Sequence, residues 1–333
     1  MHLRGRSSHS GGYARREQVD GERRGCQIVI KEEDGMIELK GIVPPVATPM
    51  NADGSVDLES LRKLLQHLIR GGVHALFVLG STGEFTMFTD EEKARVVETA
   101  VDVSAGRLPV LAGVGEMSTR RVINAARDAK SAGADALVLL LPFYYNLRHE
   151  KEKKQFFLQV ADAVELPMII YENPHTTKLS IAVETVMELS EDGRFIATKD
   201  SSGDMRRVQT LLMLRGKRKD FGILQGSEEL IGMSLLLGAD GGVPGIANLV
   251  PRLAVKLYEA AQKRDIARTL EIQKQINELR GVYLQEDSSV YGGLKYALSL
   301  AGLCKPYVGS PLLAPERKAR ENIRKLLKKY RIV

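Results

Sequence analysis

The feature that most constrains the fold of this sequence is an eightfold alternation of short apolar runs with amphipathic helical patterns, which begins at Gly41. The runs are nearly continuous in Val, Ile, Leu and Ala, as expected of strands that are buried on both faces of a parallel sheet. They occupy residues 41–48, 75–80, 109–115, 136–142, 167–173, 195–200, 221–226 and 241–245. Eight such units in succession predict an α/β protein, a (β/α)8 TIM barrel.

Helical patterns separate these runs, and each begins at an N-cap candidate and ends near a glycine. The candidates are Asp57, either Thr89 or Asp90, and Ser118. The run 241–245 has weak strand propensity, and we accept it because a clear helical pattern follows it. The rival topology, a doubly wound open sheet, lacks support because no G-x-G-x-x-G motif follows the first strand.

We expect three regions along the 333 residues. Residues 1–35 are rich in Arg, Ser and Gly, which predicts a disordered N-terminal extension, and they lack the apolar core and cleavage site of a signal peptide. Residues 36–264 form the barrel. Residues 265–333 carry helical patterns only, which predicts a C-terminal helical region that packs on the barrel.

Charge and composition argue against several classes of partner. The net charge is +6, but much of it lies at the two ends of the chain, so we expect no nucleic-acid partner. No apolar run approaches the roughly 20 residues of a membrane span, so we expect no membrane partner. The two cysteines, Cys26 and Cys304, suggest no disulfide framework and fit a reducing, cytoplasmic setting.

The strand ends also argue against a metal site. Among the six histidines only His175 follows a strand end at once, and no carboxylate trio suited to magnesium stands there. We therefore expect neither a metal nor another cofactor.

In a barrel of this type, the carboxyl ends of the strands and the loops that follow them form the active-site face. The polar residues expected there are Thr48, Ser81, Thr82, Glu84, Tyr144, Tyr145, Tyr171, Lys199, Glu228 and Glu229. The turn GSTGE (80–84) offers hydroxyls and backbone N–H groups that suit a carboxylate or phosphate, although such turns are also common as plain loops. Tyr171 also fits a packed core tyrosine, and Glu228 and Glu229 also fit the start of a helix.

Lys199 is the hardest of these residues to explain as structure, because it ends an apolar strand, FIATKD (195–200). Desolvation favours the neutral amine, and a neutral amine attacks carbonyls to form a Schiff base. Tyrosine can relay the protons that this chemistry requires. The set predicts imine catalysis on a keto acid, with Lys199 for the carbonyl and the turn 80–84 for the carboxylate.

Five motifs, in this order and spacing, resemble the pyruvate-dependent class I aldolase family of dihydrodipicolinate synthase and N-acetylneuraminate lyase. They are GSTGE (80–84), PFYYN (142–146), Tyr171 with Pro174, KDSSGD (199–204) and GADGG (238–242). The resemblance runs from about Gly41 to Leu327. It implies a TIM barrel that acts on pyruvate and an aldehyde without a cofactor, assembled as a homotetramer from two dimers.

The resemblance also implies roles for single residues. Lys199 matches the lysine that forms an imine with pyruvate, and Tyr171 matches the phenol that shuttles protons. Ser81 and Thr82, with Gly83 in the same turn, match the group that binds the pyruvate carboxylate, and Ser81 joins the proton relay. Tyr144, or else Tyr145, matches a relay tyrosine supplied across a subunit interface. The positions that match contacts to the rest of the substrate are Thr176, Ser201, Gly226, Glu228 and Glu229.

Three departures bear on the substrate. Thr176 stands where the synthases have an arginine that binds the carboxylate of aspartate semialdehyde, and Gly245 stands where the neuraminate lyases have a serine. Glu172 replaces the usual asparagine, and the sequence offers no account of it.

We therefore predict a lyase that cleaves or forms a 2-keto-4-hydroxy acid, of the 2-keto-3-deoxy sugar acid or 4-hydroxy-2-oxoglutarate type. The same imine also serves dehydratases of keto-deoxy sugar acids. The alternatives are 4-hydroxy-tetrahydrodipicolinate synthase, N-acetylneuraminate lyase, and a non-catalytic barrel that binds a keto acid and acts as a regulator.

Overall fold

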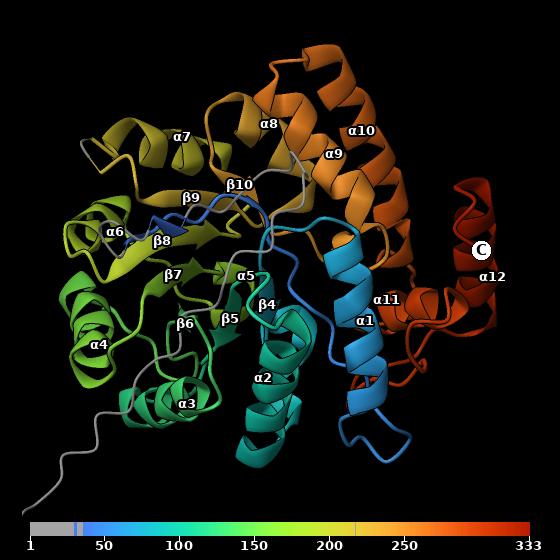
Figure 1. The fold of residues 1–333 in the computed structure, drawn as a ribbon, viewed down its shortest axis with the longest axis horizontal. Coiled ribbons are helices and arrows are strands. Elements are labelled where there is room, and N and C mark those ends of the chain that lie inside the picture. Colours follow the sequence, from blue (N-terminus) through green and yellow to red (C-terminus); the bar gives the residue numbers. More distant parts are fainter. Residues whose placement is uncertain (1–29, 32–35, 217) are drawn as a thin grey trace, which may run out of the picture.

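The computed structural model describes residues 30–31, 36–216 and 218–333, and its centre is an eight-stranded parallel sheet in the order β3-β10-β9-β8-β7-β6-β5-β4 (Figure 1). The strands are β3 (Gly41–Ile42), β4 (Leu76–Val78), β5 (Val110–Gly113), β6 (Ala136–Leu140), β7 (Met168–Glu172), β8 (Phe195–Asp200), β9 (Gly222–Gln225) and β10 (Gly241–Gly242). A parallel bridge between Pro45 and Phe77 brings the chain after β3 against β4 and closes the ring. The predicted (β/α)8 barrel is confirmed, and each predicted run contains one strand.

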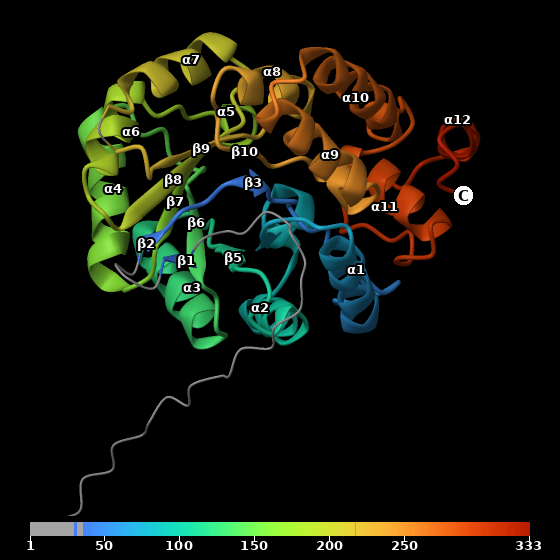
Figure 2. The same ribbon diagram turned by 45° about the horizontal axis from the view of Figure 1, so that its top comes forward.

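Helices surround the sheet and follow the strands along the chain (Figures 1 and 2). They are α1 (Leu58–Arg70), α2 (Asp90–Ser104), α3 (Thr119–Ser131), α4 (Glu150–Ala163), α5 (Pro174–Thr177), α6 (Val183–Ser190), α7 (Met205–Leu214), α8 (Ile231–Leu236) and α9 (Pro251–Gln262). Asp57 caps α1 by accepting from the Ser60 N–H, and Thr89 caps α2 in a capping box with Glu92. Asp90, the other candidate, is the first helical residue of α2.

Close approach of two backbones explains the weak strand propensity of the run 241–245. A Cβ atom at Gly241 would lie 2.2 Å from the carbonyl oxygen of Gly41 on β3, so only glycine fits where β10 meets β3. The strand therefore forms through its neighbours, β3 and β9, rather than through its own side chains.

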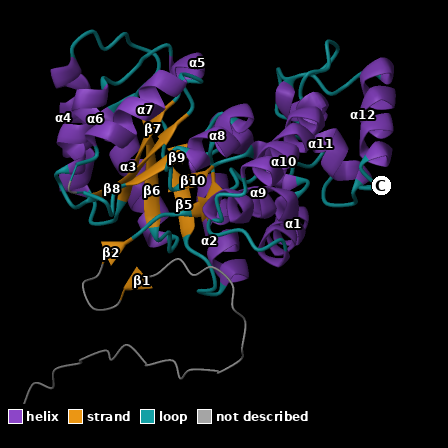
Figure 3. Cartoon of the chain, turned by 90° about the horizontal axis from the view of Figure 1, so that it is seen from above, coloured by secondary structure: helices purple, strands orange, loops and turns teal. Residues whose placement is uncertain are grey.

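Beyond α9 the described chain is helical, with α10 (Ile266–Leu279), α11 (Val290–Leu300) and α12 (Arg317–Lys329) on one side of the barrel (Figure 3). The predicted boundary at residue 264 falls between α9 and α10, and the division into three regions stays a prediction. Of residues 1–35, predicted to be disordered, only β1 (Ile30–Lys31) is described, and it pairs with β2 (Met36–Ile37). Within the described residues no helix is long and apolar enough to cross a membrane. The cytoplasmic setting stays a prediction.

A buried ion pair fastens the C-terminal helices to the turn after β4. Lys295 of α11 places its Nζ 2.5 Å from Glu84 Oε1, and both side chains are almost completely buried. The other carboxylate oxygen of Glu84 accepts from the Gly309 N–H at 2.9 Å. Glu84, one of the polar residues expected at the strand ends, thus has a structural partner in the C-terminal region.

Replacing Lys295 with methionine is expected to destabilise the fold by roughly 3–5 kcal/mol, because it leaves the Glu84 carboxylate buried without its cation. The measurement is the free energy of unfolding in a denaturant titration. Lys329→Met is the matched control, because Lys329 is 62% exposed and pairs with Glu278 at the surface, where about 1 kcal/mol or less is expected. Equal losses in the two variants would contradict a stabilising role for the buried pair.

Candidate active site

A cavity of about 340 Å³ opens at the carboxyl end of the barrel strands, where the sequence analysis placed the site. It brings together all but two of the predicted site residues: Ser81, Thr82, Tyr171, Thr176, Lys199, Ser201, Gly226, Glu228 and Glu229. The exceptions are Gly83 and Tyr144. The residues come from the ends of β4, β7, β8 and β9, so the barrel itself gathers them.

Lys199 and Tyr171 form the centre of this cavity. They are register partners on β8 and β7, and the Lys199 Nζ lies 3.9 Å from the centroid of the Tyr171 ring. The ring of Phe77, on β4, lies 5.0 Å from the same nitrogen. Lys199 is only 5% exposed, and no carboxylate of the described residues lies within salt-bridge distance of it. Lys295 is equally buried but paired, so a missing carboxylate partner, rather than burial, distinguishes Lys199.

The hydroxyl of Tyr171 belongs to a polar network. The Asn173 side-chain amide donates to the Tyr171 Oη at 2.9 Å and to the Ser81 Oγ at 3.5 Å. Burial opposes ionisation of the phenol, but the charge of Lys199 and the hydrogen bond with Ser81 outweigh it and lower the pKa of Tyr171 below its usual value. A tyrosine with a lowered pKa beside an amine is suited to proton transfer.

The turn that follows β4 presents hydroxyls to this network. Ser81 and Thr82 begin the short helix η1 (Ser81–Gly83) and line the cavity, as predicted. Gly83 is buried behind them and donates its N–H to the Gly80 carbonyl at 2.9 Å. A Cβ atom there would lie 3.0 Å from the carbonyl oxygen of Val46, so Gly83 lets the turn pack against the chain after β3.

Two carboxylates, one arginine and one tyrosine form a wall of the cavity, which we call the distal wall: Glu228, Glu229, Arg280 and Tyr283. Glu228 Oε1 accepts from the Ile246 N–H at 2.8 Å and from the Tyr283 hydroxyl at 3.3 Å. Arg280 reaches the second carboxylate, with its Nη2 3.0 Å from Glu229 Oε2.

Burial sets the charge state of Glu228. It raises the pKa of Glu228 to about 7, and the Ile246 N–H and the Arg280 charge oppose this effect only in part. Glu228 Oε2 is buried and makes no hydrogen bond within the described residues, and the Arg280 Nε lies 3.7 Å from it. Arg280 is therefore the nearest charged group to the second oxygen of this carboxyl.

Sequence analysis missed Asn173, Arg280, Tyr283 and Tyr291, which also line the cavity. Asn173 directly follows β7, so its place at a strand end was a usable signal. The other three lie in the C-terminal region, where no strand end marks a residue as part of the site. Burial raises the pKa of Tyr291 to about 12.

The tyrosine pair of the PFYYN motif lies outside the cavity of its own chain. Tyr144 and Tyr145 are 74% and 71% exposed on the loop before α4, with their rings edge to face and centroids 5.2 Å apart. Within the part of the chain that the structure describes, no group of three or more His, Cys, Asp or Glu side chains is placed to hold a metal ion.

Residues 38–330 match the model of the dihydrodipicolinate synthetase family. A 4-hydroxy-tetrahydrodipicolinate synthase of Gluconacetobacter diazotrophicus is 34% identical, covering 86% of this chain and 96% of its own length. A probable 2-dehydro-3-deoxy-D-pentonate aldolase of Escherichia coli, YjhH, is 30% identical, covering 88% of this chain and 97% of its own length.

Solved structures agree with these matches. Dihydrodipicolinate synthase of Bacteroides thetaiotaomicron superposes with a TM-score of 0.83 at 36% identity, covering 87% of this chain and 98% of its own. The Escherichia coli prophage protein YagE, solved in complex with pyruvate, has a TM-score of 0.83 at 29% identity, covering 89% of this chain and 99% of its own. The match covers the barrel, the cavity and the C-terminal helices together, and the chain belongs to the dihydrodipicolinate synthetase family as a pyruvate-dependent lyase of the class I aldolase type.

Proposed function

We propose that the chain cleaves or forms a 2-keto-3-deoxy sugar acid through a pyruvate imine on Lys199. The observation that carries this proposal is the distal wall, where Arg280 pairs with Glu228 and Glu229 in the same cavity as the Lys199 amine. Carboxylates accept hydrogen bonds from hydroxyl groups, so this wall suits the hydroxylated end of a sugar acid.

The geometry supports each step of that reaction. The Lys199 amine attacks the C2 carbonyl of pyruvate, and loss of water gives the imine. Ser81 and Thr82 bind the carboxylate, and Tyr171 transfers protons at the carbonyl oxygen. Loss of a proton from the methyl group of the imine gives an enamine, whose carbon forms the new C–C bond with the aldehyde carbonyl. Tyr171 gives a proton to the aldehyde oxygen, which becomes the product hydroxyl, and water then hydrolyses the product imine to release the keto acid and Lys199. Asn173 holds the Tyr171 hydroxyl toward Ser81. In the cleavage direction the same groups act in reverse order.

Charge at the distal wall argues against an aldehyde that carries a carboxylate. Thr176 lines the cavity where the resemblance places the arginine of the synthases. The arginine that does line the cavity, Arg280, already pairs with Glu228 and Glu229. A second carboxylate, as in aspartate semialdehyde or 4-hydroxy-2-oxoglutarate, would meet these like charges without a free cation.

The second candidate is 4-hydroxy-tetrahydrodipicolinate synthase, which is favoured by the name of the Gluconacetobacter relative. N-acetylneuraminate lyase is disfavoured by Gly245, which lines the cavity without a side chain to offer. A binding protein without catalysis is disfavoured by the unpaired Lys199 beside Tyr171.

A second copy of the chain is part of the proposal. Tyr144 cannot serve the cavity of its own chain from its exposed loop. We propose that it enters the relay of a neighbouring subunit in the homotetramer that the family resemblance implies.

Lys199→Ala is expected to abolish pyruvate-dependent turnover while the fold remains, because it removes the attacking amine. The measurement is kcat/KM for cleavage of 2-keto-3-deoxy-pentonate and for condensation of pyruvate with aspartate semialdehyde. Lys154→Ala, at an exposed ion pair with Glu188, is the control. In the unmodified chain the sugar acid should be the better substrate, and preference for the semialdehyde would favour the synthase instead.

Tyr171→Phe is expected to lower kcat by at least about 100-fold, because it removes the hydroxyl that transfers protons and keeps the ring beside Lys199. Steady-state kinetics at saturating substrate check this. An unchanged kcat would remove Tyr171 from the proton relay.

Glu228→Gln is expected to remove a pH dependence of substrate binding. The pKa of Glu228 is raised to about 7, so the group keeps its proton below that pH and is a carboxylate above it. The carboxylate accepts hydroxyl hydrogen bonds more strongly, so the KM for the sugar acid should fall as pH rises through about 7. The glutamine variant should lose this change, whereas Glu271→Gln, at an exposed ion pair of α10, should keep it. If the KM for the sugar acid depends on pH in the same way in both variants, Glu228 does not bind the hydroxylated end of the substrate.

A further inference from the structure

Three polar residues lie in register at the ends of neighbouring strands, on the side of the sheet that faces away from the barrel interior. Glu172, Asp200 and Gln225 are the last residues of β7, β8 and β9, and they pair with one another across the sheet. Each is at most 1% exposed. Because side chains alternate along a strand, they point away from the barrel interior, opposite to the preceding Tyr171 and Lys199. We call these three residues the clasp row.

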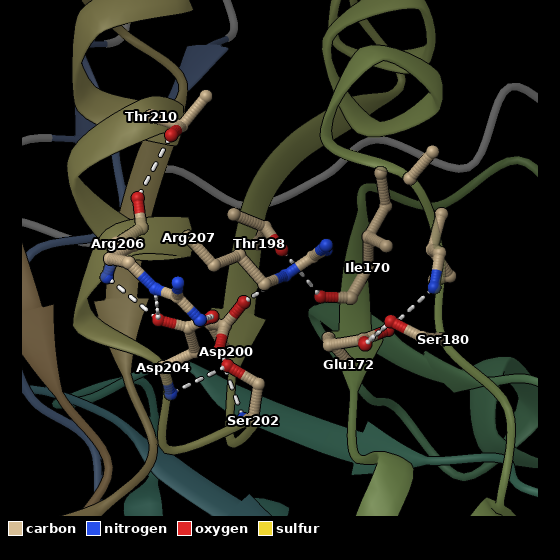
Figure 4. Close-up of polar contacts among 12 residues, drawn as sticks. Ile170, Glu172, Ser180, Thr198, Asp200, Ser202, Asp204, Arg206, Arg207 and Thr210 are labelled. Atoms are coloured by element: carbon tan, nitrogen blue, oxygen red, sulfur yellow. Dashed lines mark hydrogen bonds and ion pairs between the residues drawn. The ribbon is translucent and has the colours of Figure 1, made fainter.

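Glu172 closes the loop that follows β7. Its Oε1 accepts from the Ser180 hydroxyl at 2.5 Å (Figure 4). Its Oε2 accepts from the Ile181 N–H at 3.0 Å. The loop between these points carries Asn173 and Thr176, which line the cavity. Holding the two ends of this loop together therefore fixes where Asn173 meets the Tyr171 hydroxyl.

Asp200 does the same for the loop that follows β8. It accepts from the Ser202 N–H at 2.9 Å, and its other oxygen accepts from the Arg207 Nε at 2.6 Å (Figure 4). The loop between Asp200 and Arg207 carries Ser201, another cavity residue.

Gln225 closes the third loop with an amide. Its Oε1 accepts from the Ser227 N–H at 2.8 Å, and its Nε2 donates to the Ser234 hydroxyl at 2.9 Å. This loop carries Gly226 and Glu228 into the cavity. A neutral group therefore already performs this task at one position of the clasp row.

The two acids of the clasp row differ in their partners. Asp200 has a buried cation, Arg207 of α7, within hydrogen-bond distance. Glu172 has only neutral donors, since no cationic nitrogen of the described residues lies within salt-bridge distance of it. The charged groups around Glu172 are Asp200 and Arg207. A third charged group, Lys153 of α4, donates to the backbone carbonyl of Ser180. Burial raises the pKa of Glu172, and the more distant charge of Arg207 opposes this only in part.

We infer that Glu172, Asp200 and Gln225 are positioning residues that hold the loops around Lys199 and Tyr171. The inference accounts for the glutamate at position 172, which the sequence left unexplained. It rests on the roles proposed for Lys199 and Tyr171, but not on the identity of the sugar acid.

The test compares Glu172→Gln, Glu172→Ala and Asp200→Asn, with Glu188→Gln as control because Glu188 lies in an exposed ion pair on α6. The measured quantities are the rate at which pyruvate forms an imine that borohydride traps, the pyruvate concentration that gives half of the maximal trapping rate, and the thermal midpoint. If Glu172→Ala fails to fold, Ser180→Ala is measured in its place. If Asp200→Asn fails to fold, the double variant Asp200→Asn with Arg207→Met is measured in its place. These measurements need pyruvate alone.

Glutamine at position 172 keeps an oxygen that can accept from the Ile181 N–H, and its amide can donate to the Ser180 hydroxyl as Gln225 donates to Ser234. Its imine rate should therefore stay within about threefold of the unmodified chain. Glu172→Ala and Asp200→Asn should slow imine formation at least about tenfold, because misplaced reacting groups lose rate steeply. The pyruvate concentration at half of the maximal trapping rate should change about twofold or less, because Ser81 and Thr82 follow β4, away from the clasp row. Ser180→Ala should slow imine formation by about threefold, since it removes one of two hydrogen bonds. The double variant should recover part of the rate, because it leaves no buried cation unpaired.

Slowing by Glu172→Gln as large as that by Glu172→Ala would show that hydrogen bonds to the loop are not sufficient at position 172 and would overturn its positioning role. If the variants lower the thermal midpoint but leave the rate of imine formation unchanged, the clasp row only stabilises the fold. That result would overturn the inference. An adduct of the unmodified chain on a lysine other than Lys199 would overturn the proposed site as well. An adduct on Lys199 without turnover of the sugar acid would contradict only the proposed substrate.

Discussion

The contact between the Lys199 amine and the face of the Tyr171 ring is the interaction on which the rest of the site depends. The nitrogen lies 3.9 Å from the ring centroid and 5.0 Å from the centroid of the Phe77 ring, and no described carboxylate pairs with it. An aromatic face attracts a cation without holding it in an ion pair, so the amine stays available to a ketone. The register of β7 and β8 places these two side chains side by side.

The C-terminal helices belong to the site as much as the barrel does. Lys295 of α11 neutralises Glu84 at the end of the turn that presents Ser81 and Thr82. Arg280 and Tyr283, between α10 and α11, complete the wall around Glu228. In the proposed reaction the barrel supplies the groups that react with pyruvate, and the helical region shapes the space for the aldehyde.

Sequence patterns were sufficient for the barrel and for the residues at strand ends. Apolar runs mark buried parallel strands, and the fold then brings their carboxyl ends to one face, which places Lys199, Tyr171, Ser81 and Thr82 together. Arg280 and Tyr283 were not predictable in this way, because their approach to Glu228 depends on how α10 and α11 pack. Glu84 shows the same limit, since its partner Lys295 lies more than 200 residues along the chain. Glu172 became interpretable only through its contacts with Ser180 and Ile181.

The most direct measurement of the central claim is peptide mapping by mass spectrometry after borohydride reduction of the chain in the presence of pyruvate. The account predicts one reduced pyruvate adduct, on Lys199, and none on the equally buried Lys295, which Glu84 holds in an ion pair. An adduct on Lys295 or on a surface lysine, or no adduct while calorimetry shows that pyruvate binds, would contradict the claim that the unpaired amine beside Tyr171 is the group that reacts.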